Sequence, residues 1–308
     1  MVDLFDKRFI VVAGKGGVGR TTVSMILGVC AAKMGKRTLV CLTNAPLRYS
    51  ELLGGVTLEN GIHRANENLH VVNLNPVSSR EEYGLMVLPS RTLHRIVFGS
   101  RLVNAFFDAV PGLAEWSMLG KATHHALNET DGVPEYDLVV FDSPATGHGL
   151  DILSLPGAIV SSVPAGRMRE EAAQRVEIMK DRSRFEVIPV TIPEEMPVSE
   201  VLELLEALNE RGFPVERVVI NMIATSEASE ELENLVGEVE SCKPIPDWLL
   251  PSAVEVGARR EHDESMKRLK SLVTVPLIGL PLISRSGLDE GSLLRLAREF
   301  YAKLKNEN

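Results

Sequence analysis

The segment from Gly14 to Thr22 reads GKGGVGRTT, which is the composition of a loop that binds phosphate. Its glycines let successive backbone N–H groups turn toward an anion, and a following helix adds the partial positive charge of its first turn. An apolar run (residues 9–13) precedes the segment and a helical run (residues 23–27) follows it, as this motif requires. Thr21 stands where a hydroxyl holds Mg²⁺ beside the β- and γ-phosphates. The alternative is a glycine-rich turn that binds nothing.

One position departs from the usual motif. A lysine normally follows the last glycine of such a loop, and here the residue is Arg20. Arginine keeps the positive charge, but its planar guanidinium is not the compact ammonium that fits under the bridge between two phosphates. We therefore expect nucleotide binding to survive and the catalytic geometry to change.

A carboxylate stands at the end of a second apolar run. Asp142 follows residues 137–141, which read DLVVF. A carboxylate at the end of a buried strand is suited to supporting the water shell of Mg²⁺. We therefore predict that Thr21 and Asp142 are the magnesium-supporting residues, with Asp142 acting through water.

The elements that would position these residues alternate along the chain. Short apolar runs rich in β-branched residues are followed by turns and then by helical stretches, a pattern typical of βαβ units and a mainly parallel sheet flanked by helices. Ligands of such sheets bind at the carboxyl ends of the strands. The strands are predicted at residues 9–13, 38–42, 69–73, 137–141, 158–160, 185–190, 217–221 and 274–277.

Two stretches interrupt this alternation. Residues from about 79 to 130 contain no clear strand, and residues from about 225 to 270 are helical and heavily charged. We interpret both as helical insertions that form a small subdomain on a single α/β domain spanning residues 1–308. The Met- and Phe-containing part, residues 85–119, either packs this subdomain's own core or lines a groove for a client, and we favour the core.

Composition excludes several classes of protein. The chain has 42 Asp and Glu residues against 33 Lys and Arg residues, a formal net charge of -9, which argues against broad nucleic-acid binding. No apolar run approaches the roughly 18 residues of a membrane-spanning helix, and the start of the chain does not resemble a secretory signal. Three cysteines are too few for a disulfide framework, so we expect a cytoplasmic protein without stable membrane insertion.

Several motifs together resemble the ArsA-type ATPases, the anion-pump and tail-anchored-protein-targeting family of P-loop NTPases. A lysine at the start of the phosphate loop, here Lys15, resembles the deviant Walker A motif of that class. The block from Asp142 to Leu150 is similar to the family's switch II loop. The resemblance runs from about residue 9 to about residue 300, and its further matches are residues 190–195, 218–221 and 275–282.

The resemblance implies ATP and Mg²⁺ as ligands and a dimer as the working form. In that class the lysine corresponding to Lys15 reaches the phosphates bound by the partner subunit. Asn221 and Pro281 correspond to positions on the adenine side. The residues implied to bind the nucleotide through the loop are Gly14, Lys15, Gly16, Gly17, Val18, Gly19, Arg20, Thr21 and Thr22.

A second departure falls in the segment that corresponds to switch I. The family has an aspartate that positions the attacking water, and this chain has Asn44. An amide orients water but does not accept a proton as a carboxylate does. Glu51 is close in sequence, but its register does not make it a substitute.

These observations predict an ATP-binding ArsA-type ATPase that couples Mg·ATP binding and slow hydrolysis to opening and closing of a dimer, and thereby to a partner or client. The alternative is a catalytically weak regulatory or scaffolding subunit of a heterodimer with an active paralogue. A third candidate, a positioning ATPase like the Min and Par proteins, is disfavoured because we expect no strongly amphipathic basic helix at the end of the chain.

The remaining polar candidates have ordinary interpretations beside the functional ones. His148 either approaches the γ-phosphate or is a hydrogen-bonding loop residue, and the sequence does not separate these. His124 and His125 lack companion ligands and are interpreted as surface or packing residues. Cys30 and Cys41 are predicted to be core residues, and the cysteines do not form an arsenite or zinc motif.

Overall fold

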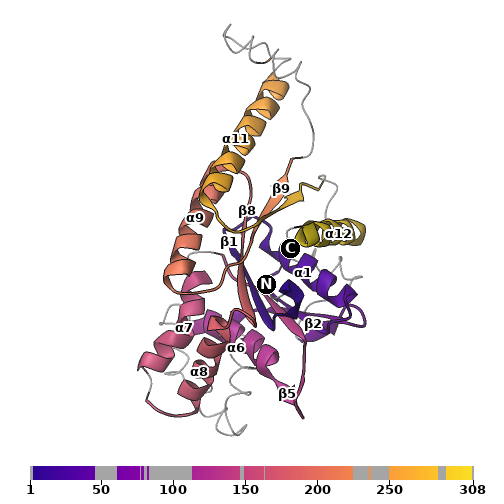
Figure 1. The fold of residues 1–308 in the computed structure, drawn as a ribbon. Coiled ribbons are helices and arrows are strands. Elements are labelled where there is room, and N and C mark those ends of the chain that lie inside the picture. Colours follow the sequence, from indigo (N-terminus) through magenta and orange to yellow (C-terminus); the bar gives the residue numbers. More distant parts are fainter. Residues whose placement is uncertain are drawn as a thin grey trace.

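The computed structural model describes residues 3–45, 61–76, 78–79, 82, 113–145, 149–162, 164–224, 236, 250–283 and 289–306. Their centre is an eight-stranded sheet in the order β10-β9-β8-β1-β7-β2-β4-β3, with helices on both faces (Figure 1). Among the described strands of this sheet only β3 runs antiparallel to its neighbour, β4, which confirms the predicted mainly parallel α/β fold. The strands of this sheet are β1 (Phe9–Gly14), β2 (Thr38–Thr43), β3 (Ile62–Arg64), β4 (Leu69–Leu74), β7 (Leu138–Asp142), β8 (Phe185–Thr191), β9 (Val218–Ile223) and β10 (Leu277–Pro281).

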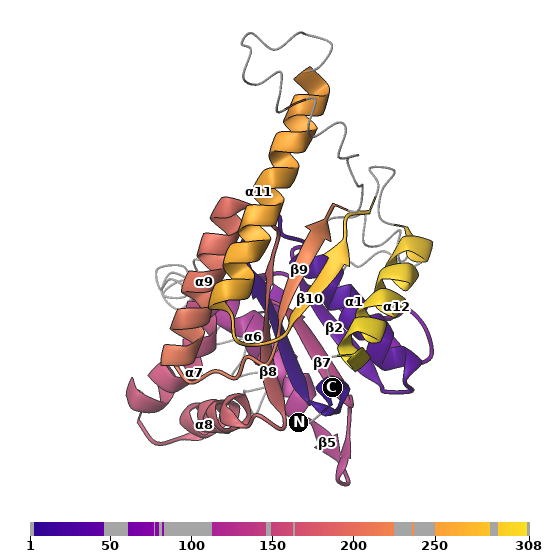
Figure 2. The same ribbon diagram turned by 45° about the horizontal axis from the view of Figure 1, so that its top comes forward.

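Helices cover the sheet in two layers. On one face α1 packs over β1, β7 and β2, and α12 packs against α1 and β10. On the other face α6, α7, α8 and α9 contribute to a second apolar core. The long helix α11 packs against α9 and extends beyond the sheet (Figure 2). The helices are η1 (Leu4–Asp6), α1 (Arg20–Lys33), α6 (Leu113–Leu127), α7 (Gly149–Ser162), α8 (Arg167–Lys180), α9 (Glu195–Glu210), α11 (Leu250–Leu272) and α12 (Glu290–Asn306), and a short hairpin joins β5 (Glu129–Thr130) to β6 (Val133–Pro134).

The central strands are apolar on consecutive residues because they are buried on both faces. In β1, Ile10 and Val12 belong to the core beneath α1, whereas Phe9 and Val11 belong to the opposite core. Every residue of β1 is buried. This strand ends at Gly14, so the sheet fixes the point at which the predicted phosphate loop begins.

Two of the predicted strands are wrong in position. Residues 158–160 lie inside α7, where Ile152 is buried and Ile159 packs on the core at helical spacing. A helix in contact with the sheet buries one face only, so this apolar triplet does not need a second covered side. The strand predicted at 274–277 begins instead at Leu277, after Pro276, which has no N–H for a sheet ladder.

The predicted helical insertions fall partly outside the described residues. Of the first, α6 is described, and its Trp116, Met118 and Leu119 are buried in the core on the sheet. Of the second, α11 is described, and most of residues 225–249 lie outside the described part. The grouping of both segments into one subdomain of a single domain, residues 1–308, therefore stays a prediction.

The expectation about the end of the chain is wrong. α12 is amphipathic, with buried Leu293, Leu296 and Phe300 on one side and Lys303 and Lys305 in its last turn. Its apolar face, however, belongs to the core that includes α1, so that face is covered within the chain. Among the helices that the structure describes, none is long and apolar enough to cross a membrane.

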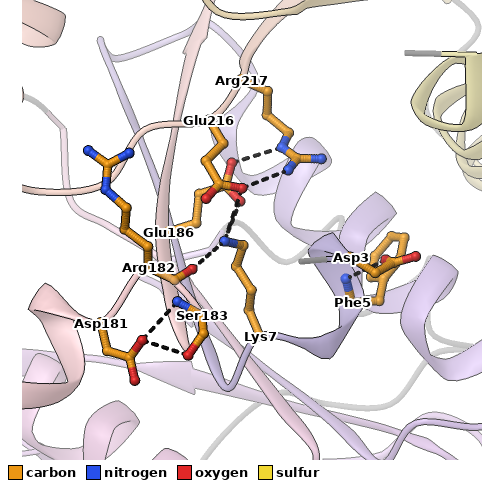
Figure 3. A network of polar contacts seen from close by, with 9 residues as sticks. All are labelled: Asp3, Phe5, Lys7, Asp181, Arg182, Ser183, Glu186, Glu216 and Arg217. Atoms are coloured by element: carbon orange, nitrogen blue, oxygen red, sulfur yellow. Dashed lines mark hydrogen bonds and ion pairs between the residues drawn. The ribbon is translucent and has the colours of Figure 1, made fainter. Parts of the chain in front are cut away.

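A buried ionic network ties β1, β8 and β9 together at their amino ends (Figure 3). The Nζ atom of Lys7 lies 3.5 Å from Glu186 and 3.1 Å from Glu216, and it donates a hydrogen bond to the carbonyl of Arg182. Arg217 donates to Glu186 at 2.8 Å. Burial raises the pKa of Glu186, although the charges of Arg217 and Lys7 oppose this. The network lies at the end of the sheet opposite to the phosphate loop.

Candidate functional site

The predicted phosphate loop connects β1 to α1. Gly17 and Gly19 have φ angles of 90° and 88°, a region in which residues with a Cβ are strained. A Cβ on Gly14 would collide with the carbonyl oxygen of Val190 in β8. Gly19 caps α1 without a side-chain hydrogen bond to the helix start. The first amides of α1 are therefore not used by a capping side chain, which is the arrangement of an anion-binding helix end.

Sheet register brings Asp142 to this loop. β7 lies beside β1, with Asp142 opposite Val12, and Thr21 Oγ1 donates a hydrogen bond to Asp142 Oδ2 at 2.7 Å. The Asp142 side chain is buried, and its Oδ1 has no hydrogen-bond partner among the described residues. Burial raises the pKa of Asp142 to about 6, against the opposing effects of the Thr21 hydrogen bond and the Arg20 charge. Hydroxyl and carboxylate oxygens are the ligands that Mg²⁺ prefers, so these two residues fit the predicted magnesium site.

The guanidinium of Arg20 is bound to the backbone that follows β7. Its Nη1 donates a hydrogen bond to the carbonyl oxygen of Ser143, the residue after β7. Burial lowers the pKa of the guanidinium, and the neighbouring Asp142 carboxylate raises it. Arg20 thus links the phosphate loop to the start of the segment that resembles switch II.

Lys15 is bound within its own subunit. Its Nζ lies 2.8 Å from Oε1 of Glu200 in α9, and each side chain is about one third exposed, 36% for Lys15 and 35% for Glu200. A neighbouring loop residue, Gly16, faces Ala145 beyond β7, where a Cβ would make only an ordinary contact. Thr22 follows in the first turn of α1 and is partly buried.

Asn221 contacts the phosphate loop directly. It is buried in β9, and its Nδ2 donates a hydrogen bond to the carbonyl of Val18 at 3.0 Å. Pro281 ends β10, whose register places it opposite Ile223 of β9. The structure therefore brings both residues predicted on the adenine side to neighbouring strands, and it shows Asn221 supporting the loop backbone.

Asn44 lies at the same carboxyl edge of the sheet, just after β2. Its φ angle is 48°, a left-handed conformation that asparagine tolerates, and its backbone N–H donates to the carbonyl of Leu74. The side chain is exposed. In the sheet order β7 lies between β1 and β2, the strand that Asn44 follows. Residues 46–54 of the predicted switch I segment, including Glu51, lie outside the described residues.

Comparisons with known proteins decide the family. The model of the Anion-transporting ATPase family matches residues 7–165 and 164–241. This chain belongs to that family. It is 23% identical to ATPase BagA of Mycobacterium tuberculosis over 94% of this chain and 91% of that protein. It is 26% identical to ATPase GET3B of Arabidopsis thaliana over 75% and 67%, and 25% identical to the Arsenical pump-driving ATPase of Escherichia coli over 72% and 40%.

In this member of the anion-transporting ATPase family, the structure adds two contacts of the glycine-rich loop that the sequence did not predict. Glu200 and the Ser143 carbonyl were not predicted as partners of the loop cations. Ser143 follows the carboxylate at the end of β7, so its position was predictable, but its contact with Arg20 was not. Glu200 carries no spacing signal, because its contact depends on how α9 packs on the sheet.

The other candidates in this family member have structural roles or lie outside the described residues. Cys30 and Cys41 are buried free cysteines, as predicted. Nδ1 of His125 lies 3.1 Å from Glu135, and the described part of the chain holds no cluster of three or more His, Cys, Asp or Glu residues fit for a metal. His148 lies outside the described residues.

Proposed function

We propose that the chain binds Mg·ATP at the loop between β1 and α1 and uses this binding, with slow hydrolysis, to open and close a dimer in the cytoplasm. The proposal rests mainly on the Thr21–Asp142 hydrogen bond of 2.7 Å beside the glycine loop. This contact puts both predicted magnesium-supporting groups together at an uncapped helix start. ATPase activity at the family level supports the same conclusion.

In the proposed mechanism the loop amides and the first turn of α1 bind the phosphates. Thr21 and Asp142 would hold Mg²⁺, which when bound neutralises charge on the β- and γ-phosphates. Arg20 stays bound to the Ser143 carbonyl and so keeps the segment after β7 close to the loop. Asn44 orients the water that attacks the γ-phosphate but does not accept its proton. ATP and water give ADP and phosphate slowly.

Lys15 is proposed to act on the partner subunit's nucleotide, as the resemblance to the deviant Walker A class implies. A positioned cation stabilises the charge that develops in the transition state, and this effect is larger once water is excluded from the site. Arg20 and Asn44 are the altered positions that would serve the nucleotide bound by this subunit, whereas Lys15, which would serve the partner's nucleotide, is present. The chain is therefore suited to completing the nucleotide site of a related subunit in a heterodimer.

The test is the Mg²⁺ dependence of ATP binding, measured by polarisation of a fluorescent ATP analogue. The wild-type chain should bind more tightly with Mg²⁺ than with EDTA, because the metal screens the phosphates. Thr21→Val, which removes one metal-supporting hydroxyl, should lose most of this difference, whereas Thr130→Val in the exposed hairpin should keep it. An unchanged difference in Thr21→Val contradicts the proposed site.

A second candidate function is a regulatory or scaffolding subunit that binds nucleotide without useful turnover. Arg20 and Asn44 favour it. Phosphate release measured beside ATP affinity separates the two: tight binding with no phosphate release above background, even with a paralogue partner added, indicates the regulatory role. Release that saturates at the same ATP concentration as binding indicates the ATPase.

A further inference from the structure

The contact between Lys15 and Glu200 concerns the residue that the proposed function assigns to the partner subunit. Lys15 is the first residue of the phosphate loop after β1, and Glu200 lies in the second turn of α9. Their charged atoms are 2.8 Å apart. An ammonium bound to a carboxylate of its own subunit is held away from other anions, so this ion pair competes with any phosphate for Lys15.

The carboxylate of Glu200 is only half satisfied. Its Oε1 accepts the contact from Lys15, while its Oε2 is buried and has no hydrogen-bond partner in the described part of the chain. A buried acceptor without a donor raises the free energy of the arrangement that contains it. Since the pair is also partly exposed, it contributes little free energy, so a competing anion can displace Glu200 from Lys15.

Glu200 itself is held in a fixed position. On either side of it, Val198 and Val201 are buried in the core shared by α9, β9 and α11. The adjacent Ser199 accepts a hydrogen bond from Nη1 of Arg268 in α11 at 2.8 Å. Lys15 is thus attached to a helix that is packed against the helix extending beyond the sheet (Figure 2).

We propose that Glu200 is a positioning residue for Lys15: it keeps this lysine on its own subunit in the nucleotide-free chain and releases it when the lysine engages phosphate in the dimer. This inference rests on the proposed function, because it requires an ATP-bound dimer. It adds a residue outside the loop that sets the ATP concentration needed for dimer closure, and it connects that residue to α11 through Ser199.

The test compares Glu200→Gln with Glu203→Gln, a neutralised exposed residue one turn further along α9. In the nucleotide-free chain, the rate at which a small amine-reactive ester modifies Lys15 is followed by mass spectrometry. Partly exposed ion pairs are worth little, so we expect Glu200→Gln to raise this rate by about 1.4- to 5-fold. Glu203→Gln should leave it unchanged.

Dimer formation is then followed by sedimentation velocity as ATP is added with Mg²⁺. Glu200→Gln should lower the ATP concentration at half-association by a similar factor, and this shift should vanish in the Lys15→Ala background. A half-association point that is unchanged or raised by Glu200→Gln in a chain that binds ATP overturns this inference alone. A wild-type chain that binds no ATP overturns the proposed function and this inference with it.

Discussion

The side-chain amide of Asn221 donates a hydrogen bond to the carbonyl of Val18 at 3.0 Å, joining two residues that are 203 positions apart. Asn221 is buried in β9, and a Cβ on the next loop residue, Gly19, would collide with the same amide nitrogen. β9 therefore supports the backbone of the loop through Asn221, and the same side chain leaves room only for glycine at position 19. Asn221 shapes the predicted phosphate loop through its contact with Val18.

Gly19→Ala should damage ATP binding more than its backbone strain alone explains. Gly35→Ala is the matched control, because Gly35 has a similar φ angle of 82° and open space around its Cβ position. Left-handed backbone costs about 1–2 kcal/mol for a residue with a Cβ, so both variants should lose that much stability in urea denaturation. Overpacking against Asn221 costs about 1–3 kcal/mol more, and we expect ATP affinity to fall by about tenfold in Gly19→Ala only.

Equal ATP affinities in the two glycine variants would show that the contact with Asn221 does not shape the binding loop. Calorimetric or polarisation titrations of both folded variants give this comparison directly.

Asp142 should make the nucleotide-free chain less stable as the pH rises. Its pKa is raised from 3.8 to about 6 by burial, so the native state binds this proton more tightly than the unfolded state. The resulting stabilisation is fully present below about pH 4 and is lost as the pH rises through about 6. We expect Asp142→Asn to flatten this part of the pH profile and to be more stable than wild type at pH 7, by on the order of 3 kcal/mol at most.

The measurement is urea denaturation from about pH 4.5 to about pH 7.5, the range in which this stabilisation is lost. It is made without Mg²⁺ or nucleotide. Asp263→Asn, an exposed carboxylate of α11, is the control and should follow the wild-type profile. If the stability of Asp142→Asn depends on pH in the same way as that of the wild type, the pKa of Asp142 is not raised.

Lys7→Met should destabilise the fold without affecting ATP binding. Lys7 and Glu186 have fully buried side chains, and removing one partner of a buried ion pair costs about 3–5 kcal/mol because the other charge is left uncompensated. Lys36→Met, which breaks the exposed pair with Asp6, should cost no more than about 1 kcal/mol. Thermal and urea unfolding give the stabilities, and an altered ATP affinity in folded Lys7→Met would contradict the separation of this network from the site.

Arg20→Lys together with Asn44→Asp should raise the rate of ATP hydrolysis. The first restores a compact cation in the loop and the second restores a carboxylate near the attacking water, a kind of group worth about 10²–10⁴-fold. The two effects act on one site and should not simply add. Phosphate release under single-turnover conditions is the measurement, and a wild-type chain that already hydrolyses ATP as fast as the double variant would contradict the deficit assigned to Asn44.

The central fold was predictable because its strands are buried on both faces and so carry consecutive apolar residues. Residues 9–13 and 38–42 show this, and both coincide with strands of the sheet. The same rule failed at 158–160, because an apolar β-branched triplet also suits the core-facing side of a helix. The local sequence pattern does not distinguish a buried strand from the core-facing side of a helix. At residues 158–160 the packing of α7 against α8 and the core favours the helix.

The place of the glycine-rich loop between a strand and a helix was predictable because its glycines and hydroxyls are adjacent in sequence. Its binding of phosphate stays a prediction. The partners of its two cations were not predictable. Glu200 and the Ser143 carbonyl reach Lys15 and Arg20 only after α9 and β7 have been placed on the sheet. Residue type is encoded locally, whereas these contacts are set by tertiary packing.

Calorimetric titration of the full chain with ATP and Mg²⁺ tests the central claim most directly. We expect a saturable heat with a dissociation constant in the micromolar range or somewhat weaker. This constant should rise by about tenfold in Gly19→Ala and stay unchanged in Gly35→Ala. A folded wild-type chain that gives no heat with either ATP or ADP would contradict the assignment of the loop from Gly14 to Thr22 as a nucleotide site.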